Sequence, residues 1–309
     1  MNRYLFYIKG LFYIGLLFIL SACNGSERTP TIPVLGNTPG VASPATVAIL
    51  SPTSIPPSAT PIPLAAKVNQ SEITLAEYQI ELALYKAAQG TDLAPDDEKR
   101  VLDNLIDESI LAQAAAEIGF SVTDAVLQEH KKQLAELPGA EKKLSDWMNA
   151  YGYDKETFDR MLSRSIGAAW MRDQIIKTVP KSAEQVHARQ ILLYNSDQAN
   201  QVLSQLEAGY DFGNLANEYD PITGGDLGWF PRGYLPNPGI EEIAFNLQPN
   251  EYSPVIESQA GLHILQLIER DPQRPLSPDA LLTLQTKALQ DWLQAQIDVS
   301  TIEIISNSP

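Results

Sequence analysis

The stretch from Gly224 to His263 decides the fold that the sequence predicts. It opens with Gly-Gly-Asp-Leu-Gly-Trp-Phe at 224–230, continues with Glu-Glu-Ile-Ala-Phe at 241–245 and closes with Gly-Leu-His-Ile-Leu at 261–265. Glycines around two large rings favour tight turns and a close approach of the backbone to an apolar surface. Apolar residues then recur at helical spacing, and afterwards alternate with polar residues as they do in a half-buried strand. The stretch therefore predicts turns, a helix and a strand, in that order.

Taken together, these three motifs resemble the parvulin family of peptidyl-prolyl isomerases, also called the PpiC or rotamase family. The resemblance covers roughly Val186 to Arg270, which is a whole domain, and its specificity lies in the order of the motifs. It implies a small antiparallel sheet flanked by helices, with peptidyl-prolyl cis-trans isomerase activity. We expect this domain at residues 181–271.

Composition excludes several other classes of protein. The chain has 309 residues, with 22 basic against 38 acidic side chains, which argues against nucleic acid or an anionic membrane surface as a partner. A single cysteine excludes an internal disulfide, and three scattered histidines argue against a histidine-built metal site. We expect neither a metal nor a cofactor.

The amino terminus has the order of a secretory signal. Arg3 and Lys9 precede the short apolar run 11–20, which is too short to cross a bilayer, and Leu-Ser-Ala-Cys follows at 20–23. This last motif matches the bacterial lipobox, which implies a lipoprotein signal at residues 1–22 and lipidation of Cys23. The alternative is an ordinary signal peptide with a chance cysteine. Either implies an extracytoplasmic protein, and the lipobox places it on the cell membrane.

Residues 23–65 are rich in Pro, Thr and Ser and contain no aromatic residue. Such a segment buries too little apolar surface to offset the entropy of ordering it. We expect a disordered tether that holds the folded part away from the membrane.

Within residues 66–180, the segment 68–74 predicts a short strand and a turn, and helical periodicity follows to residue 180. The segment 74–77 is a capping box. We expect helices that begin near Thr74, Pro95, Thr123 and Asp154, and one more that carries Leu144 and stops at Gly152. Trp147 and Trp170 fit either a groove for unfolded chains or an ordinary core.

This helical block resembles the amino-terminal chaperone region of SurA- and PrsA-type foldases. The resemblance lies in the order of the elements and in stretches such as 68–70 and 101–106. A last helix is expected from Ser277 to about Ile297, within residues 272–309, and one helix cannot bury its apolar stripe alone. The resemblance implies that this helix returns to the amino-terminal helices. The predicted fold class is therefore α+β, with a helical chaperone domain built from both ends of the mature chain and an inserted parvulin-like domain.

Prolyl isomerisation needs neither a metal nor a nucleophile. The barrier of about 20 kcal/mol comes from amide resonance. An enzyme lowers it by excluding water, holding the proline ring and placing hydrogen bonds on the twisted amide. The resemblance puts substrate-binding positions at Leu227, Leu235 and Ile240, with Phe245 behind them and Trp229 nearby.

The polar cluster of the family maps onto His263, Gln190 and Asp220. The family's first histidine is replaced by Gln190, which cannot ionise. His187 is a poor substitute, since on a strand it points to the opposite face. His263 is either an active-site residue or a strand histidine with a backbone partner, and Asp220 is either the acidic member or a turn residue before Pro221.

Loop 194–197 carries no basic residue, so phosphopeptides are not the preferred substrates. Unfolded or proline-containing exported polypeptides are the expected partners. The leading hypothesis is an extracytoplasmic, lipid-anchored prolyl isomerase and foldase. The alternative is a non-catalytic chaperone whose degenerate parvulin domain only binds such segments, and a third hypothesis is a lipoprotein scaffold.

Overall fold

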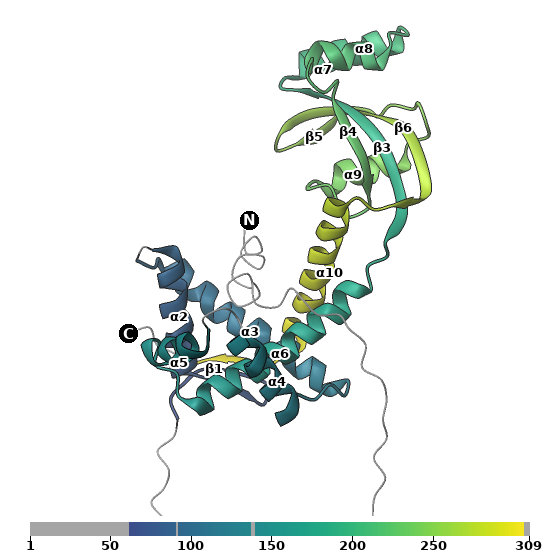
Figure 1. Cartoon of the computed structure of the whole chain (residues 1–309). Helices are drawn as coiled ribbons and strands as arrows, with labels where there is room; N and C mark the ends of the chain where they lie inside the picture. The colour runs from purple at the N-terminus through teal and green to yellow at the C-terminus, as the bar shows by residue number, and fades with distance from the viewer. Residues whose placement is uncertain (1–61, 91, 137–139, 306–309) are drawn as a thin grey trace, which may run out of the picture.

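The computed structural model describes residues 62–305, with the exception of residues 91 and 137–139. The predicted signal at 1–22, Cys23 and nearly all of the predicted tether at 23–65 lie outside these described residues. The described chain forms two lobes, a helical lobe and a sheet lobe (Figure 1). Two connections join the lobes, one on each side of the inserted sheet lobe.

The helical lobe is made from both ends of the described chain. A three-stranded antiparallel sheet in the order β2-β1-β7 crosses it, with β1 paired on both sides. These strands are β1 (Leu64–Val68), β2 (Ser71–Thr74) and β7 (Ile302–Ile304). The helices of this lobe are α2 (Leu75–Gln89), α3 (Pro95–Glu117), α4 (Asp124–Glu136), α5 (Ala140–Ala150), α6 (Lys155–Lys177) and α10 (Pro278–Val299). The predicted fold class, including a helical domain built from both ends, is confirmed.

Local signals in the sequence set where these helices begin. Thr74 accepts a hydrogen bond from the N–H of Glu77, while the Glu77 carboxylate accepts one from the N–H of Thr74 at 2.7 Å, which is the predicted capping box. Asp154 caps α6 in a similar way by accepting from the N–H of Thr157. The Glu77 side chain is fully buried, and its second oxygen accepts a hydrogen bond from Nε of Arg160 on α6 at 2.8 Å.

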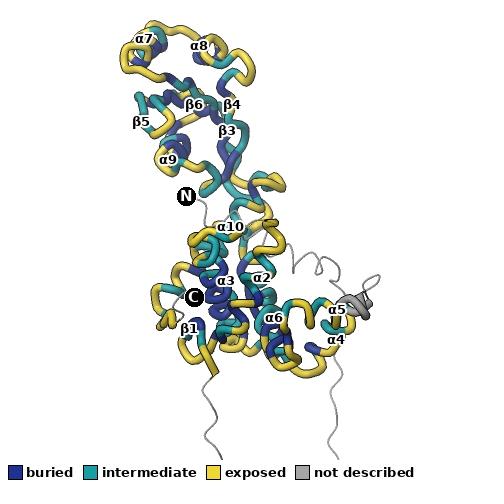
Figure 2. Tube along the Cα trace, turned by 90° about the vertical axis from the view of Figure 1, so that its left-hand side faces the viewer, coloured by how far each residue is buried: buried dark blue, intermediate teal, exposed yellow. Residues whose placement is uncertain are grey.

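Two apolar cores fill the helical lobe. The larger one joins α3, α6 and α10 to the small sheet, and Leu293 of α10 is buried in it. Figure 2 shows the buried positions running along α3. Trp170 packs against this core and stacks on Phe120, whereas Trp147 packs against the second core and stacks on Tyr153. Both tryptophans therefore take the core role of the two that the sequence left open.

The sheet lobe is a four-stranded antiparallel sheet in the order β4-β3-β6-β5. The strands are β3 (Ser182–Leu193), β4 (Asp226–Pro231), β5 (Ile256–Ser258) and β6 (Gly261–Pro275). The helices are α7 (Ser196–Glu207), α8 (Phe212–Tyr219) and α9 (Pro238–Asn246). One face of the sheet packs against α9 through Val186 and Leu265, and the other packs against α7 and α8 through Ile191 and Ile264.

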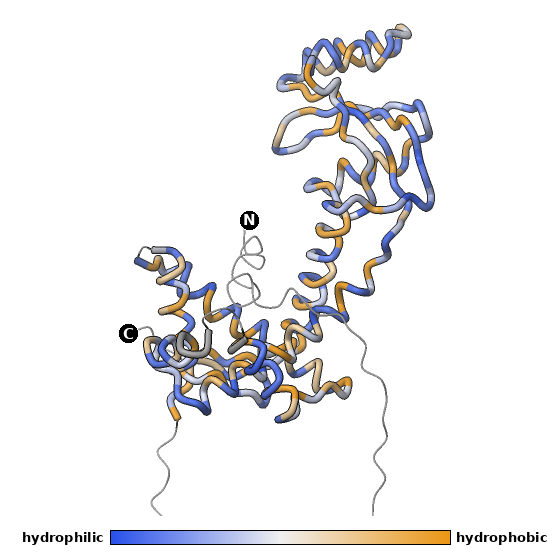
Figure 3. Tube along the Cα trace, viewed as in Figure 1, coloured by the Kyte–Doolittle hydropathy of each residue, from blue (hydrophilic) through white to orange (hydrophobic). Residues whose placement is uncertain are grey.

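The sheet lobe lies between α6 and α10 in the sequence. The chain leaves the helical lobe at the end of α6, passes through β3 to β6, and returns along α10, which packs against α6 and α3 (Figure 1). Along the helices, apolar and polar residues alternate (Figure 3). Within the described residues, every helix is too short or too polar to span a membrane.

Candidate functional site

His263 is the centre of a hydrogen-bonded group on the face of the sheet that carries α9. It lies on β6, only 4% exposed, on the same face as Leu265. Its Nδ1 lies 2.8 Å from Oε1 of Gln190 on β3, and its Nε2 lies 2.6 Å from Oγ of Ser258 on β5. Three neighbouring strands thus each contribute one polar side chain to this group.

The hydrogen-bond partners of His263 fix its tautomer. An amide oxygen only accepts, so Nδ1–H of His263 donates to Oε1 of Gln190 and Nε2 is left as an acceptor. Ser258 then donates its O–H to Nε2, and its Oγ accepts the N–H of Ala260 at 3.0 Å. Burial lowers the pKa of His263 below its ordinary value of 6.5. The imidazole is therefore neutral at neutral pH.

The structure does not bring Asp220 into this group. Its carboxylate accepts hydrogen bonds from the N–H groups of Ile222 and Thr223, both at 3.1 Å, and from the Thr223 hydroxyl. The Thr223 hydroxyl, ahead of these N–H groups, lowers the pKa of this exposed carboxyl. Asp220 closes the turn after α8, which is the structural role that the sequence left open for it.

The predicted apolar positions do lie together. Ile240 and Phe245 of α9 are buried in the core beneath the sheet, while Leu227 and Leu235 are half-buried and pack against that core. Phe245 is covered by the guanidinium of Arg232, 4.1 Å from the ring centre. Leu227 and Leu235 therefore form the accessible part of the cluster, and Phe245 supports it from behind.

The structure places Trp229 apart from the other predicted substrate-binding residues. Its neighbour Phe230 points into the core beneath the sheet, so Trp229 points to the opposite face. There it stacks on His187 with ring centres 5.5 Å apart, and the guanidinium of Arg274 lies 4.2 Å from its ring centre. Nε2 of His187 lies 2.8 Å from Oδ1 of Asp226. The rings of His187 and Trp229 both lie apart from His263.

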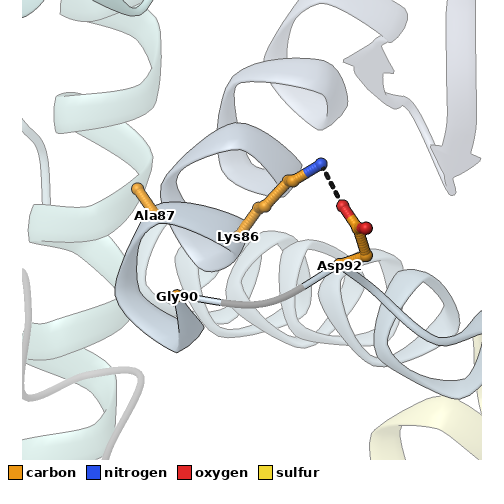
Figure 4. A pocket seen from close by; sticks show the side chains of 4 residues that line it. All are labelled: Lys86, Ala87, Gly90 and Asp92. Carbon is orange, nitrogen blue, oxygen red and sulfur yellow. Dashed lines mark ion pairs between the residues drawn. The ribbon is translucent and has the colours of Figure 1, made fainter.

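A surface pocket in the helical lobe is unrelated to this group. It has a volume of about 400 Å³ and is lined by Lys86, Ala87, Gly90 and Asp92 at the end of α2 (Figure 4). An exposed ion pair between Lys86 and Asp92, at 2.7 Å, spans it. None of these residues belongs to the sheet lobe.

Family models match both lobes. Residues 176–269 match the PPIC-type PPIase domain, and residues 58–162 match the SurA-like N-terminal domain. The chain contains a PPIC-type PPIase domain and a SurA-like N-terminal domain. The resemblances inferred from the sequence are confirmed, and the inserted domain belongs to the peptidyl-prolyl cis-trans isomerase class.

Named relatives agree with these domains. The chain is 28% identical over 228 residues to a protein named foldase protein PrsA from Caldanaerobacter subterraneus. The aligned region covers 65% of this chain and 72% of that protein. It is 30% identical over 228 residues to a protein named chaperone SurA from Nitrosococcus oceani, which covers 59% of this chain and only 51% of that protein. A solved structure of PrsA from Bacillus cereus overlays with a TM-score of 0.43 at 20% identity, covering 75% of this chain and 86% of that one.

Ser258 is a residue of the PPIase domain that the sequence analysis missed. It pairs with Gly261 across the turn between β5 and β6, and this short hairpin turns its hydroxyl toward His263. The available signal was a hydroxyl residue in the strand that forms a hairpin with the histidine strand. Without the register of that hairpin, no spacing rule selects Ser258 from its polar neighbours.

Gly225 explains why the PPIase domain needs its Gly-Gly motif. The N–H of Gln190 donates to the carbonyl of Gly225 at 2.8 Å, and Gly225 has a φ of 69°. A Cβ at this position would lie 1.9 Å from the carbonyl oxygen of Gln190. Only glycine allows the loop to approach the strand of Gln190 so closely.

Proposed function

We propose that this chain is an extracytoplasmic, lipid-anchored foldase whose PPIase domain isomerises X-Pro bonds in exported polypeptides. One observation carries the proposal for the site. The bonded side chains of His263, Gln190 and Ser258 lie on the same face of the sheet as the apolar cluster of Leu227 and Leu235. Apolar and polar groups therefore adjoin, as a twisted prolyl amide requires.

In the proposed mechanism, the apolar cluster holds the proline ring and excludes water from the amide. Oε1 of Gln190 is occupied by His263, so the NH₂ group of Gln190 is left to donate to a substrate carbonyl. Because His263 is buried and neutral, it orients Gln190 without placing a charge beside the amide. The hydrogen bonds favour the twisted amide over the planar one, and this difference lowers the barrier.

The proposed location rests on the sequence and the relatives. The signal at 1–22, the lipobox cysteine Cys23 and the tether at 23–65 support export followed by anchoring. Relatives named PrsA foldase and SurA chaperone support unfolded exported chains as the partners. The division at 66–180, 181–271 and 272–309 stays a prediction.

A second candidate function is a chaperone without catalysis. It is favoured by Gln190, which stands where the family has a histidine, and by Asp220, whose carboxylate is engaged in its own turn. In this case the apolar cluster binds extended segments and releases them unchanged.

Isomerisation of an unphosphorylated Ala-Pro tetrapeptide by residues 62–309 separates the two functions. We expect His263→Ala to lower kcat/KM by about 10²-fold, the scale for loss of one placed group. The matched control is His187→Ala, because His187 lies on the opposite face and should leave kcat/KM unchanged. An inactive parent that gains activity with Gln190→His would establish the chaperone function instead.

Anchoring is tested by cell fractionation. The full chain should stay with the membrane fraction, whereas Cys23→Ser should remove the lipidation site and release the protein after export. A Cys23→Ser variant that stays in the membrane fraction with its signal cleaved would exclude the proposed anchor.

A further inference from the structure

The segment between β4 and α9 folds around one buried carboxylate. Glu241, in the first turn of α9, is 8% exposed and accepts hydrogen bonds from consecutive backbone N–H groups. The N–H of Gly233 lies 2.6 Å from one oxygen, and those of Tyr234 and Leu235 each lie 2.9 Å from the other. Successive N–H groups of this kind form a concave anion site. Here the anion belongs to the chain itself.

The loop held by Glu241 carries one wall of the apolar cluster. The side chain of Leu235 packs against the core that contains Ile240 and Phe245. The Leu235 N–H bonds to Glu241, the residue next to Ile240. The carboxylate therefore ties the backbone at Leu235 to the helix that carries Ile240.

Helix α10 supports the same loop from another side. Gly233 has a φ of 84°, and a Cβ there would lie 3.2 Å from Cδ2 of Leu284 and 3.5 Å from Cδ of Lys287. Both side chains belong to α10, which Leu293 anchors in the core of the helical lobe. Figure 1 shows α10 rising from the helical lobe toward α9. The loop is thus in contact with both lobes.

We propose that Glu241 is a positioning residue for prolyl isomerisation, and that segment 232–235 is where the helical lobe supports the proline pocket, through Leu284. The inference rests on the proposed function, because it takes the cluster of Leu227 and Leu235 as that pocket. Glu241 does not touch the peptide. It acts through Leu235, so its loss should weaken the binding of proline and leave the hydrogen bonds of His263 in place.

The test measures KM and kcat separately for the Ala-Pro tetrapeptide, using the full chain. Glu241→Ala should raise KM about tenfold, since small misplacements of a binding wall have effects of this order or larger. Glu241→Gln keeps one acceptor oxygen for three donors and should give an intermediate KM. In both variants the pH profile of kcat should match the parent. The matched control is Glu242→Gln, because Glu242 is the exposed neighbour on the same helix.

The contribution of α10 is tested in the same assay. Leu284→Ala should raise KM by about threefold, less than Glu241→Ala, because it removes packing and keeps the hydrogen bonds. Leu282→Ala is the control, since Leu282 lies on the same helix and is 52% exposed.

The outcomes separate this inference from the proposed function. An active parent whose KM is unchanged in Glu241→Gln and Glu241→Ala overturns the positioning role alone, and so does a fall in kcat with KM unchanged. If Glu241→Ala does not fold, Glu241→Gln decides. An inactive parent overturns the proposed function, and the tetrapeptide Kd from NMR titration then decides, since equal Kd values in the parent and Glu241→Gln overturn the positioning role.

Discussion

The two lobes solve the problem of a buried carboxylate differently. In the helical lobe, Glu77 is fully buried and pairs with Arg160, with Arg164 also within 3.5 Å. In the sheet lobe, Glu241 is almost as buried but is satisfied by backbone N–H groups alone. An ion pair joins two helices that are distant in sequence, whereas backbone bonds shape one local loop.

The difference extends to the neighbouring ionisable groups. Glu81 and Glu108 share the region of Arg164 in the helical lobe, and burial raises the pKa of both carboxyls, that of Glu81 to about 7. In the sheet lobe, burial lowers the pKa of His263. Buried ionisable groups therefore cluster in the helical lobe, whereas the candidate site is built from neutral hydrogen-bonding groups.

The largest expected effect is in the helical lobe. Glu77→Ala leaves Arg160 and Arg164 without their shared partner and removes the capping box, so the lobe should lose about 3–5 kcal/mol of unfolding free energy. Hydrogen exchange followed by mass spectrometry reports each lobe separately. Protection should fall in α2 and α6 and stay unchanged in β3 and β6. The control Glu72→Ala removes an exposed glutamate nearby and should change stability by less than about 0.5 kcal/mol.

The next effect is confined to the sheet lobe. Gly225→Ala and Gly228→Ala both place a side chain at positive φ, which costs about 1–2 kcal/mol. Only Gly225→Ala also clashes with Gln190, because a Cβ at Gly228 meets no atom within 4 Å. Gly225→Ala should therefore lower the free energy of unfolding by about 1–3 kcal/mol more than Gly228→Ala does. It should also abolish isomerisation. Equal thermal unfolding of the two variants would contradict the close approach.

The pH dependence of the two lobes should have opposite signs. The pKa of Glu81 is higher in the folded protein than its ordinary value of 4.5. The helical lobe therefore gains stability as pH falls from about 7 toward 5. The pKa of His263 is lower in the folded protein than its ordinary value of 6.5. The sheet lobe therefore loses stability as pH falls below 6.5. Each slope is at most about 1.4 kcal/mol per pH unit. Hydrogen exchange at pH 7.5, 6.5 and 5.5 measures both. Glu81→Gln should reduce the pH dependence of stability in the helical lobe, where Glu108 still contributes, and His263→Gln should reduce it only in the sheet lobe.

The smallest effect concerns the pocket of Figure 4. Lys86 and Asp92 are both largely exposed, so their attraction is screened by water and salt. Asp92→Asn should leave the Tm and the isomerisation rate unchanged. A measurable change in either would show that this end of α2 matters to the site.

Local signals explain what the sequence predicted. The starts of α2 and α6 follow from the caps at Thr74 and Asp154, which act within one turn. The family resemblance predicts that Gln190 and His263 lie together, and β3 and β6, which carry them, are paired neighbours. These inferences needed only short spacings or a whole-domain resemblance.

Tertiary geometry explains what the sequence did not predict. Leu227 and Trp229 are two positions apart and should share a face, but a β-bulge between Ala188 and Arg189 leaves Leu227 unpaired and separates them. The position of Ser258 beside His263 depends on the register of a hairpin. The hydrogen bonds of Asp220 depend on the turn that follows it. Glu241 looked like one more polar helix residue, because its donors lie in a loop whose path is set by packing.

The pairing of β1 with β7 also bears on the order in which the chain folds. α10 and β7 follow the sheet lobe in the sequence, and the core of the helical lobe lacks Leu293 without α10. The sheet lobe is built from one contiguous segment, so its sheet can form without either end of the chain. A helical lobe closed by contacts across more than two hundred residues must form late, because long-range loop closure is slow. We therefore expect the isomerase domain to fold before the lobe that supports it.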